Sequence, residues 1–300
     1  MCEPAVDVPD WLDELSFSAA GPPWLAMGLS RLAHAGWLAP DEHRSTELAQ
    51  RHRLLATRHD EVFAALPGTA AAGAEVLGLV RVWFAQHRPD VVLAPDPPDI
   101  HPLEAAARLV QEDLCLMVSH GDEHHLDAAC LCFPSYWRLA EKLGRPTAAV
   151  HGPVPGYVSE LSARVDRYLQ RLRPGSMSQR RNWSVHDAPD LFAPWPPATA
   201  RHLEADDVAD GLWLRSERQT LRRLAQTDAV LFTIRVQQTP LRALARRPDV
   251  ARRLADRLAA QPVELTAMNG LDGYHDAVLR WLQRLSVDLR PSATPTRRHG

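Results

Sequence analysis

The chain has 300 residues, with 34 Lys and Arg against 37 Asp and Glu, and a formal net charge of −3. This balance argues against nucleic acid or an anionic membrane surface as the main partner, because both select clustered positive charge. No apolar run reaches the length of a membrane span, and the acidic start lacks the basic-then-apolar order of a signal peptide. The four cysteines form no secreted disulfide framework, so the sequence predicts a cytoplasmic protein.

Residues 1–109 are predicted to pack on a core that forms later in the chain. Tryptophans among prolines suggest an irregular segment over residues 1–45 that is anchored by its aromatic side chains. Apolar spacing then predicts helices at Glu42–Phe63 and Ala70–His87. Pro89–Pro102 reads as a loop, and Leu103–Leu109 as a short helix.

Residues 110–240 carry the pattern of an antiparallel sheet. Glu112–Ser119 and His124–Phe133 predict one hairpin, with a turn at His120–Glu123, and the pair His124–His125 is expected to be solvated. Short helices and a long helix at Val158–Leu172 follow, and then a strand at 180–187. Gly211–Leu224 and Val230–Gln237 predict a second hairpin. This order, in which two strands are followed by helices and then by three strands, is that of a PAS-type domain, although many α+β folds share parts of it.

The predicted fold is therefore α+β: a PAS-like antiparallel sheet with helices on one side, plus N-terminal and C-terminal helical extensions. Residues 241–290 read as the C-terminal helices, and 291–300 as a disordered tail. In the core, Cys130 and Cys132 lie on one strand face without a second pair at finger spacing, so they are interpreted as buried inert thiols.

The run Thr147–Tyr157 is the main candidate for a site. His151 begins a loop that prolines stiffen and glycines open to close backbone approach, just before the long helix. An imidazole held there is suited to bind a metal or haem iron. The alternative is a histidine that orders the loop by hydrogen bonding, since one histidine makes no metal motif.

Several runs in this sequence resemble the α subunits of haem-dependent oxidative N-demethylases. The matching runs are Gln111–Met117, Cys132–Trp137, Val150–Tyr157, Arg181–Ser184, Leu214–Leu221 and Phe232–Arg235. The resemblance extends over roughly Trp24 to Leu285. It implies a PAS-fold subunit that holds haem b and takes a methyl group from a small secondary amine such as dimethylamine, using oxygen, with formaldehyde and the shorter amine as products. It also implies a reductase-type partner that carries flavin and an iron–sulfur centre; this chain shows no G-x-G-x-x-G run or phosphate loop of its own.

The resemblance also implies roles for particular residues. His151 is the expected iron ligand, with His186, on the strand predicted at 180–187, as the alternative. Tyr136, Tyr157, Arg218 and Arg235 are expected to line or hold the haem, with an arginine on a propionate. Glu217, His186 and Trp183 are expected on the catalytic side, where Glu217 receives the ammonium group of the substrate and takes its proton.

Strand alternation gives these late strands two different faces. It places Arg215, Glu217 and Gln219 on one face, and Ser216, Arg218 and Thr220 on the other. A cross-strand Glu–Arg pair on a solvated face is the alternative explanation of Glu217. The alternative to an enzyme is a haem gas sensor, or a PAS module that binds a small molecule without catalysis.

Overall fold

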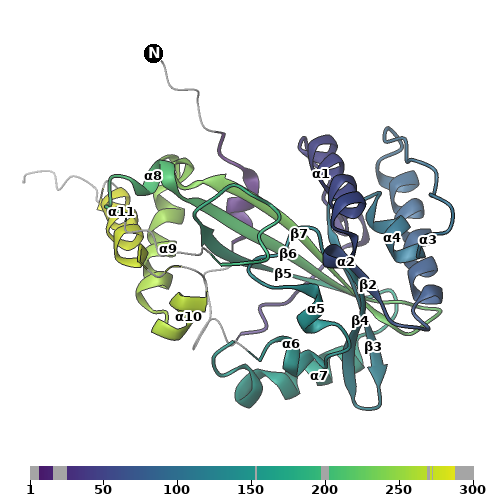
Figure 1. Cartoon of the computed structure of the whole chain (residues 1–300). Coiled ribbons are helices and arrows are strands. Elements are labelled where there is room, and N and C mark those ends of the chain that lie inside the picture. Colours follow the sequence, from purple (N-terminus) through teal and green to yellow (C-terminus); the bar gives the residue numbers. More distant parts are fainter. Residues whose placement is uncertain are drawn as a thin grey trace, which may run out of the picture.

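A single antiparallel sheet organises the chain (Figure 1). The structure is a computed structural model that describes residues 7–15, 26–152, 154–196, 203–268, 271 and 273–287; the predicted disordered tail, 291–300, lies outside them. The sheet has seven strands in the order β1-β5-β6-β7-β3-β4-β2, and every neighbouring pair is antiparallel. The strands are β1 (Ser30–Arg31), β2 (Phe63–Ala65), β3 (Asp113–His120), β4 (Glu123–Cys130), β5 (Met177–His186), β6 (Trp213–Arg223) and β7 (Val230–Pro240).

Both predicted hairpins are confirmed. Strands β3 and β4 pair around Gly121 and Asp122, and β6 pairs with β7 from Trp213↔Pro240 to Arg223↔Val230. Strand β4 ends at Cys130, three residues before the predicted end. The reason is local: the amides of Cys132 and Phe133 donate to the carboxylate of Asp113 instead of continuing the ladder.

The N-terminal helices are α1 (Arg44–Thr57), α2 (His59–Val62), α3 (Ala70–His87) and α4 (Pro102–Ala107). Helix α3 has the predicted bounds. The predicted helix Glu42–Phe63 is interrupted at Arg58, whose backbone leaves the helical region (φ −139°, ψ 36°), and the chain then enters the edge strand β2. Sequence periodicity did not show this edge strand, because three residues are too few to display alternation.

Helices α5 (Leu139–Lys142) and α6 (Thr147–Val150), the π-helix η4 (Tyr157–Leu161) and α7 (Ser162–Arg171) lie between β4 and β5. The predicted long helix Val158–Leu172 therefore begins with a π-helical turn rather than an α-helical one. Single π turns are rare and are found disproportionately at functional sites.

The C-terminal elements are α8 (Val208–Gly211), the 3₁₀ helix η5 (Leu241–Arg246), α9 (Pro248–Ala259), α10 (Val263–Met268) and α11 (His275–Val287). Helices α9 and α11 form a hydrophobic cluster with the ends of β5 and β6 and with Trp11 of the 3₁₀ helix η1 (Asp10–Glu14). We call it the C-terminal hydrophobic cluster. The predicted helical extensions are thus present at both ends of the sheet (Figure 1). None of the described helices combines the length and the apolar character needed to cross a bilayer.

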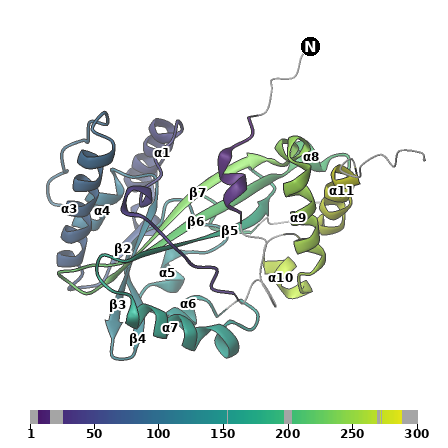
Figure 2. The same ribbon diagram turned by 180° about the vertical axis from the view of Figure 1, so that it is seen from behind.

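The N-terminal segment, residues 26–43, covers one face of the central strands. Seen from behind, it runs across the sheet toward α1 (Figure 2). Arg218 on β6 donates to the carbonyls of Gly36, in the 3₁₀ helix η3 (His34–Gly36), and Trp37. Arg235 on β7 forms ion pairs with Asp41 and with Glu47 of α1. We call this covered face the outer face.

A buried ion pair joins α1 to β3. Arg51 Nη1 lies 3.0 Å from Asp113 Oδ1, and both side chains are 0% exposed. Cys130 and Cys132 are buried beside it, as predicted, and Cys130 Sγ lies 3.8 Å from Arg51 Nη1. A buried charge that loses its partner is left without compensation, so this pair holds the helix and sheet together.

Replacing Asp113 by alanine is expected to lower the free energy of unfolding by about 3–5 kcal/mol, because Arg51 then stays buried without a counter-charge. Urea unfolding measures the effect. The matched control is Arg58→Ala, which breaks the Arg58–Glu61 pair, where both side chains are 52% exposed. That change is expected to cost less than about 1 kcal/mol. Equal costs for the two variants would contradict the argument.

Candidate functional site

Polar side chains gather on the sheet face opposite the N-terminal segment, which we call the inner face. Residues directly opposite one another on paired strands share a face. The register pairs Arg180 with Gln219, Asn182 with Glu217, Ser184 with Arg215 and His186 with Trp213, so all eight lie on the inner face. This confirms the predicted alternation of Arg215, Glu217 and Gln219 against Ser216, Arg218 and Thr220.

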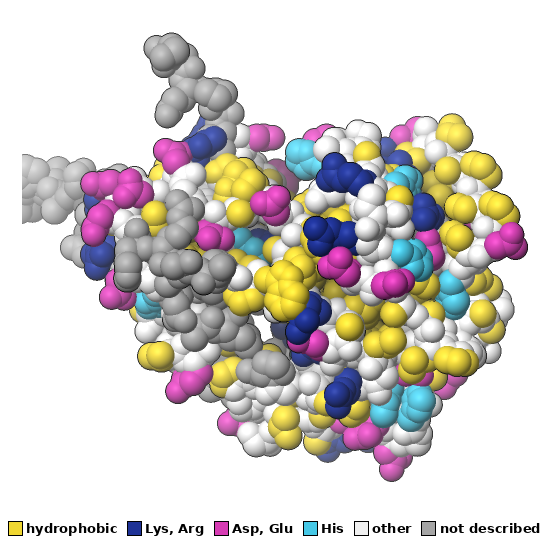
Figure 3. Space-filling model, in the orientation of Figure 1, with side chains coloured by type: hydrophobic (Ala, Val, Ile, Leu, Met, Phe, Trp, Pro, Cys, Tyr) yellow, Lys and Arg dark blue, Asp and Glu magenta, His cyan; other side chains and the backbone are white. Residues whose placement is uncertain are grey.

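The inner face keeps access to solvent although helices lie over it. Glu217 and Gln219 are partly exposed, whereas the outward neighbours Ser216, Arg218 and Thr220 are buried. Strand β6 lies inside the sheet, between β5 and β7, so this access must come through a hollow above the strand. The space-filling view shows the surface hollowed near its centre, beside the C-terminal helices (Figure 3).

His151 ends α6 and presents one ring nitrogen for coordination. Its Nδ1 lies 2.9 Å from the carbonyl oxygen of Thr147, which can only accept, so Nδ1 carries the proton. The residue is exposed at the surface, yet desolvation by the surrounding atoms lowers the pKa of His151; the hydrogen bond to Thr147 partly offsets this, and the charges of Arg180 and Lys142 lower the pKa further. The ring is therefore neutral at pH 7, with an unprotonated Nε2. A carbonyl that fixes the tautomer in this way is the usual support of a metal-binding histidine.

The loop after His151 is held in a defined shape. Gly156 has φ 75°, a left-handed conformation that suits glycine, and it leads into the π-helix. Tyr157 then stacks on the His151 ring, with centroids 4.6 Å apart and 14° between the planes. The Tyr157 hydroxyl is buried without a hydrogen-bond partner, and burial raises its pKa. An orphan hydroxyl on a ring that stacks on His151 is suited to a ligand with polar atoms.

Arg180 is a second cation on the inner face. It donates to Asn182 Oδ1 and forms no ion pair with any described residue. Burial lowers its pKa, while the negative charge of Glu217 and the neighbouring Tyr157 partly offset that effect. A desolvated guanidinium without a carboxylate partner favours an anionic ligand, because its fork geometry matches carboxylates.

His186 and Tyr136 form a second aromatic pair, 4.3 Å between centroids and 15° between planes. Tyr136 has a left-handed backbone (φ 59°), and its buried hydroxyl has no hydrogen-bond partner. Arg215, beside them, donates to Ser135 Oγ and to the carbonyls of Phe133, Pro134, Asp190 and Leu191. Arg215 is therefore committed to holding these loops against the sheet.

Burial, and then the charge of Arg215, lowers the pKa of His186 to about 3. A histidine whose folded pKa lies below its unfolded value of about 6.5 contributes stability above pH 6.5, and that contribution is lost as the pH falls toward 3. His186→Phe keeps the ring that stacks on Tyr136 and removes the titration. We expect the wild-type protein to lose up to about 1.4 kcal/mol more per pH unit than this variant in urea unfolding between pH 6 and pH 4. The same change at the exposed His43 is the control, and an identical pH slope in wild type and His186→Phe would contradict the assignment.

Glu217 lies between the two inner-face arginines. Its charge raises the pKa of both Arg180 and Arg215, so it is near each of them. Gln219 Nε2 donates to Glu217 Oε2 at 2.9 Å, but Glu217 forms no ion pair with any residue that the structure describes. The alternative of a cross-strand Glu–Arg salt bridge therefore has no contact to support it.

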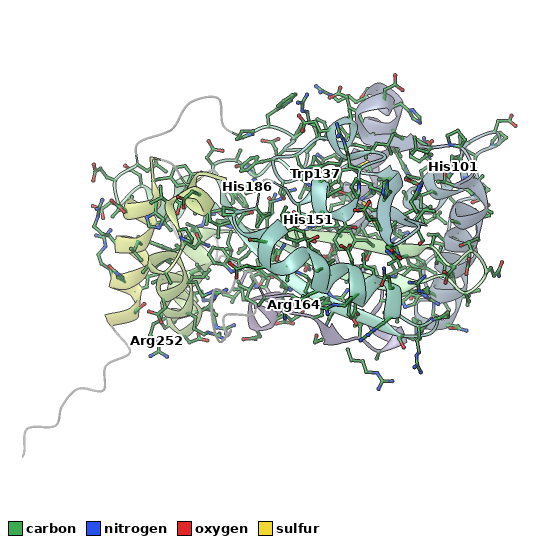
Figure 4. All side chains as sticks on the ribbon, turned by 90° about the horizontal axis from the view of Figure 1, so that it is seen from below. His101, Trp137, His151, Arg164, His186 and Arg252 are labelled. Atoms are coloured by element: carbon green, nitrogen blue, oxygen red, sulfur yellow. The ribbon has the colours of Figure 1, made fainter. Side chains whose placement is uncertain are left out.

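Viewed from below, His151 and His186 project near the middle of the molecule together with Trp137 (Figure 4).

Three predicted site residues lie on the other side of the sheet. The guanidinium groups of Arg218 and Arg235 are engaged by the N-terminal segment and α1. Trp183, opposite Ser216, packs against the C-terminal hydrophobic cluster. None of the three shares a face with Glu217, because each is an odd number of residues from an inner-face position of its strand.

Arg180 is the site residue that the sequence reasoning missed. The available signal was its spacing of two, four and six residues from Asn182, Ser184 and His186, which places all of them on one strand face. The adjacent pair Arg180–Arg181 concealed it, since only the register shows which arginine faces inward. Arg181 points outward and forms an ion pair with Glu14.

The fold and the site together define a class of protein: an α+β, PAS-like sheet with a histidine, two tyrosines and an unpaired arginine above its inner face. The model of one family, described as haem-dependent oxidative N-demethylase, alpha subunit-like, matches residues 88–279. The chain belongs to this family. The family description indicates haem dependence and an oxidative N-demethylase activity, and "alpha subunit" implies that the enzyme has further subunits.

The residues present fit a haem group. His151 offers an unprotonated Nε2, and Arg180 offers a guanidinium that forms no ion pair with any described residue. The orphan hydroxyls of Tyr136 and Tyr157 add two polar atoms at the same face. A haem has an iron that takes an imidazole and propionates that take arginine, so each of these groups has a counterpart on it.

Proposed function

We propose that this chain is the haem-binding catalytic subunit of an oxygen-dependent oxidative N-demethylase that acts on a small methylated secondary amine. The products are formaldehyde and the shorter amine. The observation that carries the proposal is a combination of two groups: His151 has a free Nε2 on the helical side of the site, and Glu217 has a partly exposed carboxylate on the sheet side. His186 is the weaker choice of iron ligand, since it is buried against Tyr136 with its Nε2 3.1 Å from Ser184 Oγ.

The charges of the inner face support a cationic substrate. Arg215 is fully engaged by carbonyl oxygens and one hydroxyl, and Arg180 is assigned to a haem propionate. Once a propionate neutralises Arg180, the charge of Arg215 remains near Glu217, but Arg215 directs its hydrogen bonds to carbonyls and a hydroxyl. Glu217 therefore lacks a counter-ion in hydrogen-bond contact among the described residues. A protonated secondary amine supplies that counter-ion, and a desolvated charged hydrogen bond holds it.

The carboxylate also has a chemical task. A secondary amine is protonated in water and must lose that proton before its nitrogen can release electrons. Glu217 accepts the ammonium hydrogen bond and can take the proton at Oε1 or Oε2. When bound, haem supplies the redox chemistry with dioxygen that oxidises the N-methyl group. The resulting imine takes up water and breaks down to formaldehyde and the shorter amine.

Electrons must reach the site from outside the chain. We propose a reductase-type partner with flavin and iron–sulfur centres, in accord with the subunit status that the family description implies. The protein then contributes binding, orientation and proton transfer, while the cofactor carries the redox steps.

Given a chemical reductant and air, haem-loaded protein is expected to release formaldehyde from dimethylamine above the background of the haem-free protein. A colorimetric formaldehyde assay measures it. tert-Butylamine, which has no N-methyl group, is the control and should give none. If a panel of methylated amines gives no formaldehyde with haem fully loaded, the protein is a haem sensor or a binding module instead.

A further inference from the structure

The tip of the β3–β4 hairpin holds a cluster of metal-ligand side chains that the haem site does not use. His120, His125 and Asp127 each direct one ligand atom to within 4.8 Å of the others, the only such group of three among the described residues. The His120 and His125 rings stack with centroids 4.4 Å apart. His120 Nε2 lies 2.6 Å from Asp127 Oδ2. Two imidazoles and a carboxylate are a donor set that suits divalent first-row metals.

A β-bulge sets the position of Asp127. The register of β3 and β4 shifts between Leu116 and Met117, which pair with Ala128 and Leu126, so Asp127 is the extra residue of β4. Bulges re-aim a side chain away from its regular direction. Here the bulge brings Asp127 to His120, seven residues earlier in the chain.

The Asp127 carboxylate is buried and only half satisfied. Its side chain is 8% exposed, Oδ2 meets His120, and Oδ1 has no hydrogen-bond partner. A buried carboxylate oxygen without a partner is destabilising, and a bound cation removes that penalty. This unsatisfied oxygen distinguishes the cluster from an ordinary surface His–Asp pair, in which both oxygens reach water.

Neighbouring groups orient His125 for coordination. His125 Nδ1 lies 3.0 Å from the carbonyl oxygen of Gly144, so in the neutral ring Nε2 is the free nitrogen. Glu123 Oε2 lies 3.5 Å from that Nε2 and can supply a fourth ligand. Ligand atoms around tetrahedral zinc lie roughly 3.3 Å apart, and the three ligand atoms here lie within 4.8 Å of one another, so side-chain shifts on the order of 1 Å complete the geometry.

We propose that His120, His125 and Asp127 bind a divalent transition metal ion of the zinc type, with Glu123 or water as the fourth ligand. The site lies next to the segment that joins α5 to α6. Gly144 accepts from His125, and the amide of Leu126 donates to the carbonyl of Arg145. A bound ion therefore fixes the hairpin against the segment that carries His151.

The expectation that His124 and His125 are both solvated is wrong for His124, which is 2% exposed.

The test is equilibrium dialysis of the full-length, haem-loaded protein against zinc chloride, with bound zinc measured by mass spectrometry. One zinc per chain is expected in the wild type. His120→Ala and Asp127→Asn should each weaken zinc affinity at least about 10-fold, because each removes one of three protein ligands. Both should leave haem content unchanged.

His87→Ala is the matched control, since His87 also lies close to another histidine, His34, at 3.4 Å, with no third ligand beside them among the described residues. It should bind zinc like the wild type. Saturating zinc should raise the thermal midpoint of the wild type and of His87→Ala, but not that of His120→Ala. Absence of stoichiometric zinc at about 100 μM, or unchanged affinity in both ligand variants, would overturn the proposal and leave a surface His–Asp pair.

Discussion

His151→Ala is expected to lose most of its haem. The substitution removes the one nitrogen that the site presents unprotonated and accessible, because the Thr147 carbonyl holds Nδ1 and the lowered pKa keeps the ring neutral. Haem would then be held only by Arg180 and by apolar contact, without an iron–nitrogen bond. The haem-to-protein ratio after gel filtration, from the pyridine haemochrome spectrum, measures the loss.

His186→Ala is the matched control for this prediction. His186 lies on the same sheet face but is buried against Tyr136, with its Nε2 beside Ser184. We expect this variant to keep its haem, with a normal Soret shift when carbon monoxide is added to the reduced form. If His186→Ala loses haem while His151→Ala keeps an unaltered spectrum, the two histidines have exchanged roles.

Glu217→Gln is expected to weaken binding of dimethylamine by about 10- to 100-fold. The substitution keeps the shape of the side chain and its contact with Gln219, and removes the charge. A hydrogen bond to a charged group is worth about 1.5–3 kcal/mol, and each 1.4 kcal/mol is a factor of ten in affinity. Titration of the haem absorption spectrum with dimethylamine measures the affinity, and haem content is expected to stay constant.

The control for this variant is Glu14→Gln, which removes a carboxylate that pairs with Arg181 on the outer face. It should bind dimethylamine like the wild type. Unchanged affinity in Glu217→Gln, with normal haem content, would mean that Glu217 only receives the hydrogen bond from Gln219. The amine site would then have to lie nearer Tyr136 or His186.

Much of the local structure follows from the sequence. The spacing of apolar residues predicted α3 with its observed bounds, and alternation predicted both hairpins and the two faces of β6. These features depend on periods of 3.6 and 2 residues, which local sterics impose and which a sequence displays directly. His151 could also be singled out, because prolines and glycines mark its loop as stiff and closely approached.

The role of each residue on the central strands depended on which face of the sheet the N-terminal segment covers. Alternation separates Glu217 from Arg218, but it does not say which of them meets the N-terminal segment. That choice rests on contacts between distant residues, such as Arg235 with Asp41, which are 194 positions apart in the chain.

By itself, the sequence determined the strands, the long helices and the loop that carries His151, because their signals are local. The tertiary structure alone decided that Arg218 and Arg235 hold the N-terminal segment while Arg180 stays unpaired on the inner face. It alone also brought Asp127 to His120 through a bulge. Both outcomes depend on register and on long-range packing, where a shift of one residue moves a side chain to the opposite face of the sheet.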